Sequence, residues 1–437
     1  RYFKLGITTI PEFLENRYDR ATRVLVSFIF LVAYIVTMLP LVLYAGSVAM
    51  ERIFNVTDLV GGNRFLAITI MCVALGVIGG IYAIFGGLKA VAVSDSLNGV
   101  IFIIGAVVIV PILAFIILGE GSLITGVQRM ISDAPPEHLN AIKSWDAQAP
   151  EIPWPMIILG CSINHISYYC TNQSIMQRVL GAKNLKEAQK GALLSGLALV
   201  FCPLFLVMPG IIQRIRDGGV LTDFDMAYPT LVHDILPTPV LGFFAAVMFG
   251  AILSSFNSVL NSSMTLFTLD ILPVISKKER TAQQEITIAK RFGIVLCLAS
   301  IVIAPFLMYL PAGISTFLNQ MWGYYGVPVL AVAMMGMLNK NIPNFAPKLT
   351  IIVHIIVYGV LMNTIPLHFL YFEVTAFVVD IVLLWACSKI KPRETPYELP
   401  NLEVVDMTPW KYRIPVVVVT FAILAAIYIT FSPLGVG

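Results

Sequence analysis

Long apolar runs dominate this sequence and limit the folds that the chain can adopt. One run, "VLGFFAAVMFGAILSSFNSVLNSSMTLFTLDILPV" at 240–274, exceeds the roughly 20 residues that cross a bilayer as a helix. Apolar residues make up 58% of the chain, charged residues only 12%, and the mean hydropathy is +0.86. These values lie far from those of soluble globular proteins, so the sequence predicts a polytopic membrane protein.

The apolar runs between charged or Pro/Gly-rich breaks predict eleven transmembrane helices. We expect helices because lipid cannot satisfy open backbone groups, and a transmembrane β-barrel would show short segments of alternating polarity instead. The fold class is therefore an all-α polytopic membrane protein. The predicted spans are 21–48, 64–86, 91–118, 153–176, 188–213, 237–268, 292–309, 313–338, 349–365, 367–388 and 414–433.

The distribution of basic residues predicts the orientation. With the N-terminal segment in the cytoplasm, the cytoplasmic loops hold 22 of the 28 Lys and Arg residues and the outside loops hold the other 6, as the positive-inside rule requires. The net charge of +3 is thus a signal of topology, and we expect no nucleic-acid partner. The lipid bilayer is the expected surrounding, in a plasma membrane or a bacterial or archaeal inner membrane.

The sequence argues against an enzyme. It contains neither an HExxH nor a GxSxG pattern, and no paired acids or dyad with an orienting acid stand out. The six cysteines are scattered singly through the spans without a CxxC pair, which is typical of reduced packing residues. We expect no protein-bound cofactor.

Polar side chains interrupt the run at 251–263, "AILSSFNSVLNSS". One reading is helix packing, since Ser and Asn are common where membrane helices touch. The other is a site for a hard cation, which needs several oxygen ligands; adjacent hydroxyls at Ser254 and Ser255, with Asn257 and Ser258 a turn on, favour the cation. The positions that share one helical face are Ser254, Ser258, Asn261 and Ser262, flanked by Ala251 and Ser255.

Asp95 in "VAVSDSLNGVIFI" lies close to an apolar span. An acid in this position normally faces a cavity, a partner or an ion rather than lipid. The alternative is a residue at the helix end that reaches the interface or interacts with the helix dipole.

A third polar group follows in "INHISYYCTNQSIMQR". The spacing places its polar side chains on a broad face of the helix predicted at 153–176, which is typical of a lined pathway, although a single intramembrane His is more often a packing residue. Gln320 in "LNQMWGYYGVPV" stands beside aromatic residues that could stack on a ligand ring or pack. Amides and aromatics without an intramembrane Lys or Arg suit a polyol better than a free anion. The residues on the face are Asn164, His165, Tyr168, Asn172 and Gln173.

Three segments together resemble the solute:sodium symporter family, and most closely its sodium/sugar cotransporter branch. They are "TIPEFLENRYD" at 9–19, "YYCTNQSIMQRVLGAKNLKEAQKG" at 168–191 and "SSFNSVLNSSMTLFTLDI" at 254–271. The resemblance runs along essentially the whole chain. It implies a LeuT-type inverted repeat of five plus five helices that works by alternating access.

Aligned with the family, the chain looks N-terminally truncated, lacking core helix 1 and most of helix 2. The resemblance then implies one transmembrane transporter domain over 1–437. It consists of a cytoplasmic segment at 1–20, core helices 3–10 at 21–338 and additional C-terminal helices at 339–437.

The resemblance also implies roles for particular residues. The sodium site would use the carbonyl of Ala251 and the hydroxyls of Ser254 and Ser255. A second sodium site, present in some members, would use Asp95, Asn257 and Ser258, although Asn257 stands where hydroxyls are usual.

For the solute, Tyr168 matches the aromatic inner gate and Gln320 matches a sugar-hydroxyl ligand. His165 falls about where a sugar-contacting Asn lies, and Asn164 is its neighbour. Leu199 stands where the sugar branch has a Lys, so the resemblance supports sodium more strongly than sugar.

We therefore predict a secondary active symporter that imports a small polar solute, a sugar or polyol, with sodium as the coupling ion. The alternative substrates are a carboxylate, a sialic-acid-like sugar acid or an amino acid. The alternative of another class is a sodium-responsive membrane sensor.

Overall fold

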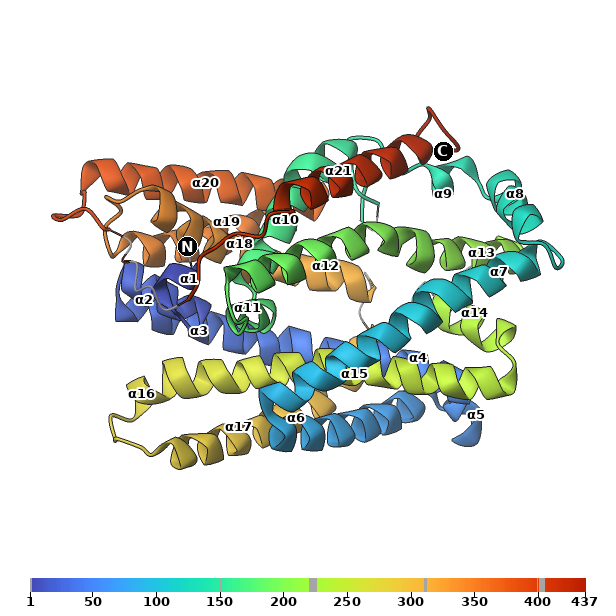
Figure 1. Cartoon of the computed structure of the whole chain (residues 1–437), viewed down its shortest axis with the longest axis horizontal. Coiled ribbons are helices and arrows are strands. Elements are labelled where there is room, and N and C mark those ends of the chain that lie inside the picture. The colour runs from blue at the N-terminus through green and yellow to red at the C-terminus, as the bar shows by residue number, and fades with distance from the viewer. Residues whose placement is uncertain (1, 150, 220–225, 310–312, 399, 401–404) are drawn as a thin grey trace.

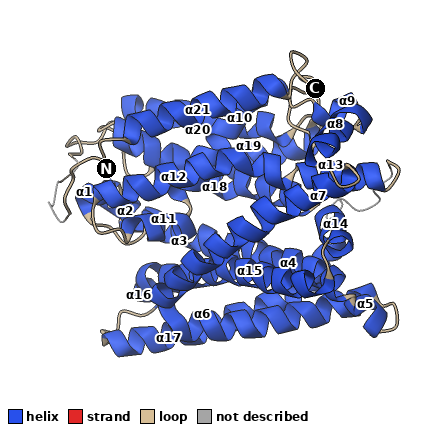
Figure 2. Ribbon diagram, turned by 45° about the vertical axis from the view of Figure 1, so that its right-hand side comes forward, coloured by secondary structure: helices blue, strands red, loops and turns tan. Residues whose placement is uncertain are grey.

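The computed structural model of the chain describes residues 2–149, 151–219, 226–309, 313–398, 400 and 405–437. Side chains within 87–92 and at 94 and 204 lie outside this description. The described residues form a bundle of long helices that run in both directions along one axis (Figure 1). Figure 2 shows helices and loops and no strand among the described residues.

The first half of the bundle contains α1 (Tyr2–Leu5), α2 (Ile10–Arg17), α3 (Arg20–Ala33), η1 (Tyr34–Met38), α4 (Leu39–Phe54), α5 (Val56–Leu59), α6 (Arg64–Phe102), η2 (Ile103–Ile109), α7 (Val110–Leu118), α8 (Leu123–Asp133), α9 (Pro136–Leu139), α10 (Trp154–Thr171) and α11 (Gln173–Leu180). The second half contains α12 (Leu185–Leu206), α13 (Met208–Arg216), α14 (Ala227–Ile235), α15 (Thr238–Leu266), η4 (Phe267–Ile271), α16 (Leu272–Ile275), α17 (Ala282–Ile303), η5 (Ala304–Tyr309), α18 (Ile314–Leu338), α19 (Ala346–Thr364), α20 (Phe369–Ile390) and α21 (Arg413–Thr430).

Ten helical stretches of the described residues are long and apolar enough to cross a membrane, and they coincide with ten of the eleven predicted spans. The exception is the span predicted at 153–176. Its helix, α10, has 18 residues, but the polar side chains that suggested a pathway also lower its hydropathy. The N- and C-termini lie at opposite ends of the bundle in Figure 1. An odd number of crossings is needed for this arrangement, so α10 is the eleventh crossing.

Figure 1 also agrees with the predicted orientation. The N-terminus, α2, α11 and α16 lie at its left-hand end, and α5, α8, α9 and the C-terminus lie at its right-hand end. The left-hand end carries the loops that are rich in Lys and Arg, so the predicted orientation puts this end in the cytoplasm.

Small residues let the central helices approach closely. A Cβ on Gly46 of α4 would lie 2.5 Å from Ile252 Cγ2, and one on Gly79 of α6 would lie 3.0 Å from Leu253 Cδ2. Glycines at such contacts let the backbones of membrane helices pack against each other. These close contacts pack α15, the helix with the polar stretch, between α4 and α6.

The segment 2–19 closes the cytoplasmic end. Thr9 and Glu12 form a capping box at the start of α2. Arg17 is fully buried and donates hydrogen bonds to the carbonyls of Gly336 and Asn339, at 2.7 Å each. Asp19 caps α3 and pairs with Lys348 at 2.5 Å. Partial burial opposes the charge of Asp19, but the hydrogen bonds from Lys348 and Thr22 outweigh it and lower the pKa of this carboxyl.

Candidate sodium and solute sites

The hydroxyls of α15 follow one another along a single stripe, as the sequence predicts. Ser258 donates to the carbonyl of Ser254 at 2.5 Å, and Ser262 Oγ lies 2.8 Å from the carbonyl of Ser258. Ser262 Oγ also lies 3.1 Å from Gln177 Oε1 on α11. The stripe therefore faces α11, which comes from a segment about 80 residues earlier in the chain.

Asp95 and Ser258 are brought together through Arg178 of α11. The guanidinium Nη2 donates both to Asp95 Oδ2 and to Ser258 Oγ. The sequence alone does not indicate that Arg178 is the partner of Asp95. Two of the three residues predicted for the second sodium site thus share a cation, the guanidinium, in this conformation.

Asn257, the third residue of that predicted site, is fully buried. Neither its Nδ2 nor its Oδ1 has a hydrogen-bond partner among the described residues. A buried amide without partners costs free energy, so Asn257 is a polar group with capacity for a ligand.

The residues predicted for the first sodium site lie on one turn of α15. Ala251 and Ser254 are half-buried and Ser255 is exposed. All three belong to the regular helix, in which backbone carbonyls accept hydrogen bonds within the helix. The side-chain oxygens of Ser254 and Ser255 are therefore the groups that α15 itself can offer to an ion.

The predicted face on one continuous helix at 153–176 is wrong in its second half. The helix ends at Thr171, and Asn172 is extended and caps α11 by accepting from the N–H of Ser174 at 2.9 Å. Gln173 is buried and bonds the backbone of Ile10 and Thr8 at 3.0 and 3.2 Å. A helix-capping Asn stops one helix and starts the next, so Asn172 and Gln173 have structural roles.

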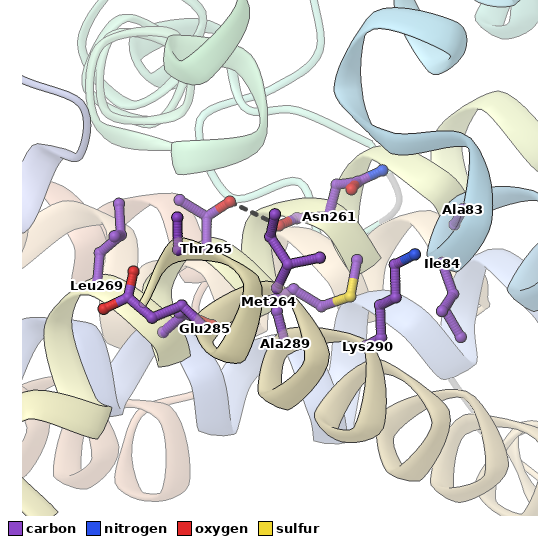
Figure 3. A pocket seen from close by; sticks show the side chains of 12 residues that line it. Ala83, Ile84, Asn261, Met264, Thr265, Leu269, Glu285, Ala289 and Lys290 are labelled. Atoms are coloured by element: carbon purple, nitrogen blue, oxygen red, sulfur yellow. Dashed lines mark hydrogen bonds between the residues drawn. The ribbon is translucent and has the colours of Figure 1, made fainter. Parts of the chain in front are cut away.

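Asn261 also contacts a cavity at the edge of the stripe. It lines a cavity of about 350 Å³ between α6, α15, η4 and α17, together with Thr265, Glu285 and Lys290 (Figure 3). Thr265 Oγ1 donates to the carbonyl of Asn261 at 2.9 Å. This cavity contains none of the residues predicted to bind the solute.

An aromatic cluster surrounds Tyr168. Its ring meets Trp322 edge-to-face at 5.0 Å, and Trp322 meets Tyr325 at 4.9 Å. Trp322 Nε1 donates to Ser167 Oγ at 2.5 Å, which fixes the indole against α10. The structure therefore joins the predicted gate residue to α18, the helix that carries Gln320.

The other predicted solute residues lie nearby on α10 and α18. Gln320 is half-buried, and its backbone carbonyl accepts a hydrogen bond from the Tyr358 hydroxyl at 3.2 Å. His165 is exposed, and its Nδ1 lies 2.7 Å from the carbonyl of Cys161 in its own helix. Asn164 is buried, and its Nδ2 donates to Glu373 Oε1 and Oε2 at 3.2 and 3.1 Å.

Three buried ionisable residues of α19 and α20 were not predicted from the sequence. They are Glu373, His354 and Asp380, none of which has any exposed surface. The two acids could have been noticed in the sequence, because they interrupt the otherwise apolar run "YFEVTAFVVDIVLLWA". His354 bridges Asp380 Oδ2 at 2.7 Å and the carbonyl of Gly323 at 3.0 Å, and so ties α19 and α20 to α18.

Many long membrane helices with polar groups buried between them are typical of a secondary transporter. The particular family follows from sequence similarity: residues 1–344 match the family model described as Sodium:solute symporter family. The chain belongs to this family, whose members transport solutes together with sodium. It is a multi-pass membrane transporter and not an enzyme.

The chain is 38% identical over 415 residues to the uncharacterized symporter YidK of Escherichia coli (strain K12), covering 94% of this chain and 71% of the relative. It is 28% identical over 438 residues to sodium/glucose cotransporter 1 of Ovis aries, covering 89% and 64%. It is 31% identical over 363 residues to sodium/myo-inositol cotransporter 2 of Bos taurus, covering 77% and 52%. The chain thus spans about half to seven-tenths of the length of these relatives.

A solved structure of similar fold is described as the substrate-bound outward-open state of a Na+-coupled sialic acid symporter. The TM-score is 0.71 at 20% sequence identity, and the match covers 91% of this chain and 80% of that one. This likeness confirms the LeuT-type helical fold that the sequence predicts.

Proposed function

We propose that this chain imports a small polar solute, a sugar or polyol, in symport with sodium across a bacterial inner membrane. The observation that carries the sodium part is the hydroxyl stripe of α15 beside the partly buried acid Asp95. Its oxygens come from Ser254, Ser255 and Ser258, and uncharged and acidic oxygens are the ligands that a desolvated hard cation prefers.

Three predicted solute residues support the solute part of the proposal. Tyr168 offers an aromatic face that can stack on a sugar ring. Asn164 and Gln320 offer amides that can bond hydroxyl groups, and the Tyr168–Trp322 contact joins their two helices. The relatives named as glucose and myo-inositol cotransporters favour the same class of solute.

Sodium and solute would be coupled through α11, which follows α10 directly and contacts the hydroxyl stripe of α15. Sodium on α15 stabilises the conformation that binds solute, and by linkage the solute then tightens the binding of sodium. The same coupling between sodium and solute would apply to the second candidate solute, a sugar acid. The name of the sialic acid symporter favours this candidate.

The test is uptake into proteoliposomes that contain the purified protein. An inward sodium gradient is compared with an equal potassium gradient, using separate labelled sugars, polyols, sugar acids and amino acids. Accumulation of a sugar or polyol with sodium alone supports the proposal, and accumulation of a sugar acid selects the second candidate. If no solute accumulates with sodium, the symporter proposal fails and a sodium-responsive sensor takes its place.

A further inference from the structure

Glu373 is a carboxyl group that the proposed transport mechanism does not use. It lies in the second turn of α20, within the span Phe369–Ile390, and none of its surface is exposed. Its hydrogen bonds come from one group, the Nδ2 of Asn164 on α10, which lies 3.2 Å from Oε1 and 3.1 Å from Oε2.

No described cation faces Glu373. From α10, Asn164 and the Cys161 thiol face it. From α18, the backbone of Gly323 lies so close that a Cβ there would be 3.0 Å from Glu373 Oε1. From α19 the Tyr358 ring packs beside it, but its hydroxyl donates to the carbonyl of Gln320. Of the other buried acids and histidines of α19 and α20, His354 and Asp380 are bonded to each other. His368, the N-cap residue of α20, uses its Nδ1 to accept a hydrogen bond from the N–H of Leu370.

A carboxylate in this setting carries a large desolvation cost. One amide donor does not replace the hydration shell of an anion, and a buried carboxyl without a cationic partner becomes neutral by binding a proton. A proton also needs no cavity, which suits a side chain packed on every side. A neutral carboxyl can still accept the N–H of Asn164 through its carbonyl oxygen.

We propose that Glu373 is a proton-binding site inside the membrane domain and that its protonation positions Asn164 and α18 for solute binding. The bound proton keeps α20 packed against both α10 and α18. Asn164 stands one turn before Tyr168 on α10, and Gly323 stands three residues after Gln320 on α18. Loss of the proton places an uncompensated negative charge between these two helices.

Infrared difference spectroscopy on the purified protein tests proton binding without any solute. Between acidic and alkaline buffer, the wild type gives a C=O stretching band of a buried protonated carboxyl group. This band disappears in Glu373→Gln, shifts in Glu373→Asp and stays in Asp380→Asn and in the exposed control Glu279→Gln. Absence of the band in the wild type, or its persistence in Glu373→Gln, overturns the proposal. The shift in Glu373→Asp keeps the assignment testable if the Gln variant does not fold.

The effect on transport rests on the proposed function and is measured by sodium-driven uptake against pH. Solute affinity linked to one proton falls by about tenfold per pH unit above the pKa of the site. The half-saturating solute concentration should rise with this slope in the wild type and in Glu279→Gln, and stay constant in Glu373→Gln. Equal slopes in all three proteins overturn the positioning role. If none of the three proteins shows uptake but the wild type shows the infrared band, the result contradicts the proposed function and supports the proton site.

Discussion

Hydroxyl groups within the spans satisfy their own donors by bonding to the carbonyl four residues earlier. Ser258, Ser262, Ser263 and Thr265 all do so on α15, at 2.5–2.9 Å. This bond uses the hydroxyl hydrogen and leaves the oxygen lone pairs to accept from another group. Ser258 uses them for Arg178. A stripe of such hydroxyls therefore presents oxygens, which is the property that a cation site needs.

Ser255→Ala tests whether the oxygens of this turn bind sodium. Because the substitution removes one oxygen ligand and little volume, we expect the sodium concentration for half-maximal uptake to rise by roughly tenfold, the effect of about 1.4 kcal/mol. Sodium titrations of uptake in proteoliposomes measure it. The matched control is Ser195→Ala, an exposed Ser of α12 bonded to its own helix. Identical sodium dependence in the two variants would remove Ser255 from the site.

The packing of α18, α19 and α20 depends on one glycine. A Cβ at Gly323 would lie 2.5 Å from the hydroxyl of Tyr358 and 3.0 Å from Glu373 Oε1. Both neighbours are buried, so the added methyl group forces the three helices apart. In contrast, a Cβ at Gly359 of α19 meets the Tyr324 ring at an ordinary 3.6 Å.

Gly323→Ala should therefore destabilise the protein by about 1–3 kcal/mol, the usual range for overpacking a buried contact. Gly359→Ala should be neutral or slightly stabilising, because Ala is the better helix former by about 1 kcal/mol. Thermal unfolding of the two purified variants in detergent measures the difference. Equal midpoints for both variants would contradict the close packing of α20 against α18.

Helices were predictable from the sequence because hydropathy reports length and composition, which are local properties. The break at Asn172 was not, since it depends on a helix cap and on Gln173 reaching the backbone of Ile10, about 160 residues away. The Glu373–Asn164 bond likewise joins residues 209 positions apart. The hydroxyl stripe was predictable because helical periodicity is local, whereas its partner Arg178 required the tertiary structure.

On the scale of the whole molecule, the positions of the termini fix the number of crossings as odd. Hydropathy supports ten spans among the described residues, and α10 supplies the eleventh even though its polar side chains make it the least apolar. Its polarity is acceptable because α10 packs between α18 and α20, which shield Asn164 and Ser167 from lipid. The helix of low hydropathy is thus the one that carries the predicted gate.

Cysteine labelling across α10 tests this crossing and the orientation together. Ser144 and Lys183 are both exposed; Ser144 lies in the loop before α10, and Lys183 lies after α11, in the loop that leads to α12. With α10 spanning the membrane and the positive loops inside, a membrane-impermeant maleimide should label Ser144→Cys in intact cells. It should label Lys183→Cys only after permeabilisation. The wild type supplies the background from its six native cysteines. Labelling of both variants in intact cells would mean that α10 does not cross, and the reverse pattern would invert the orientation.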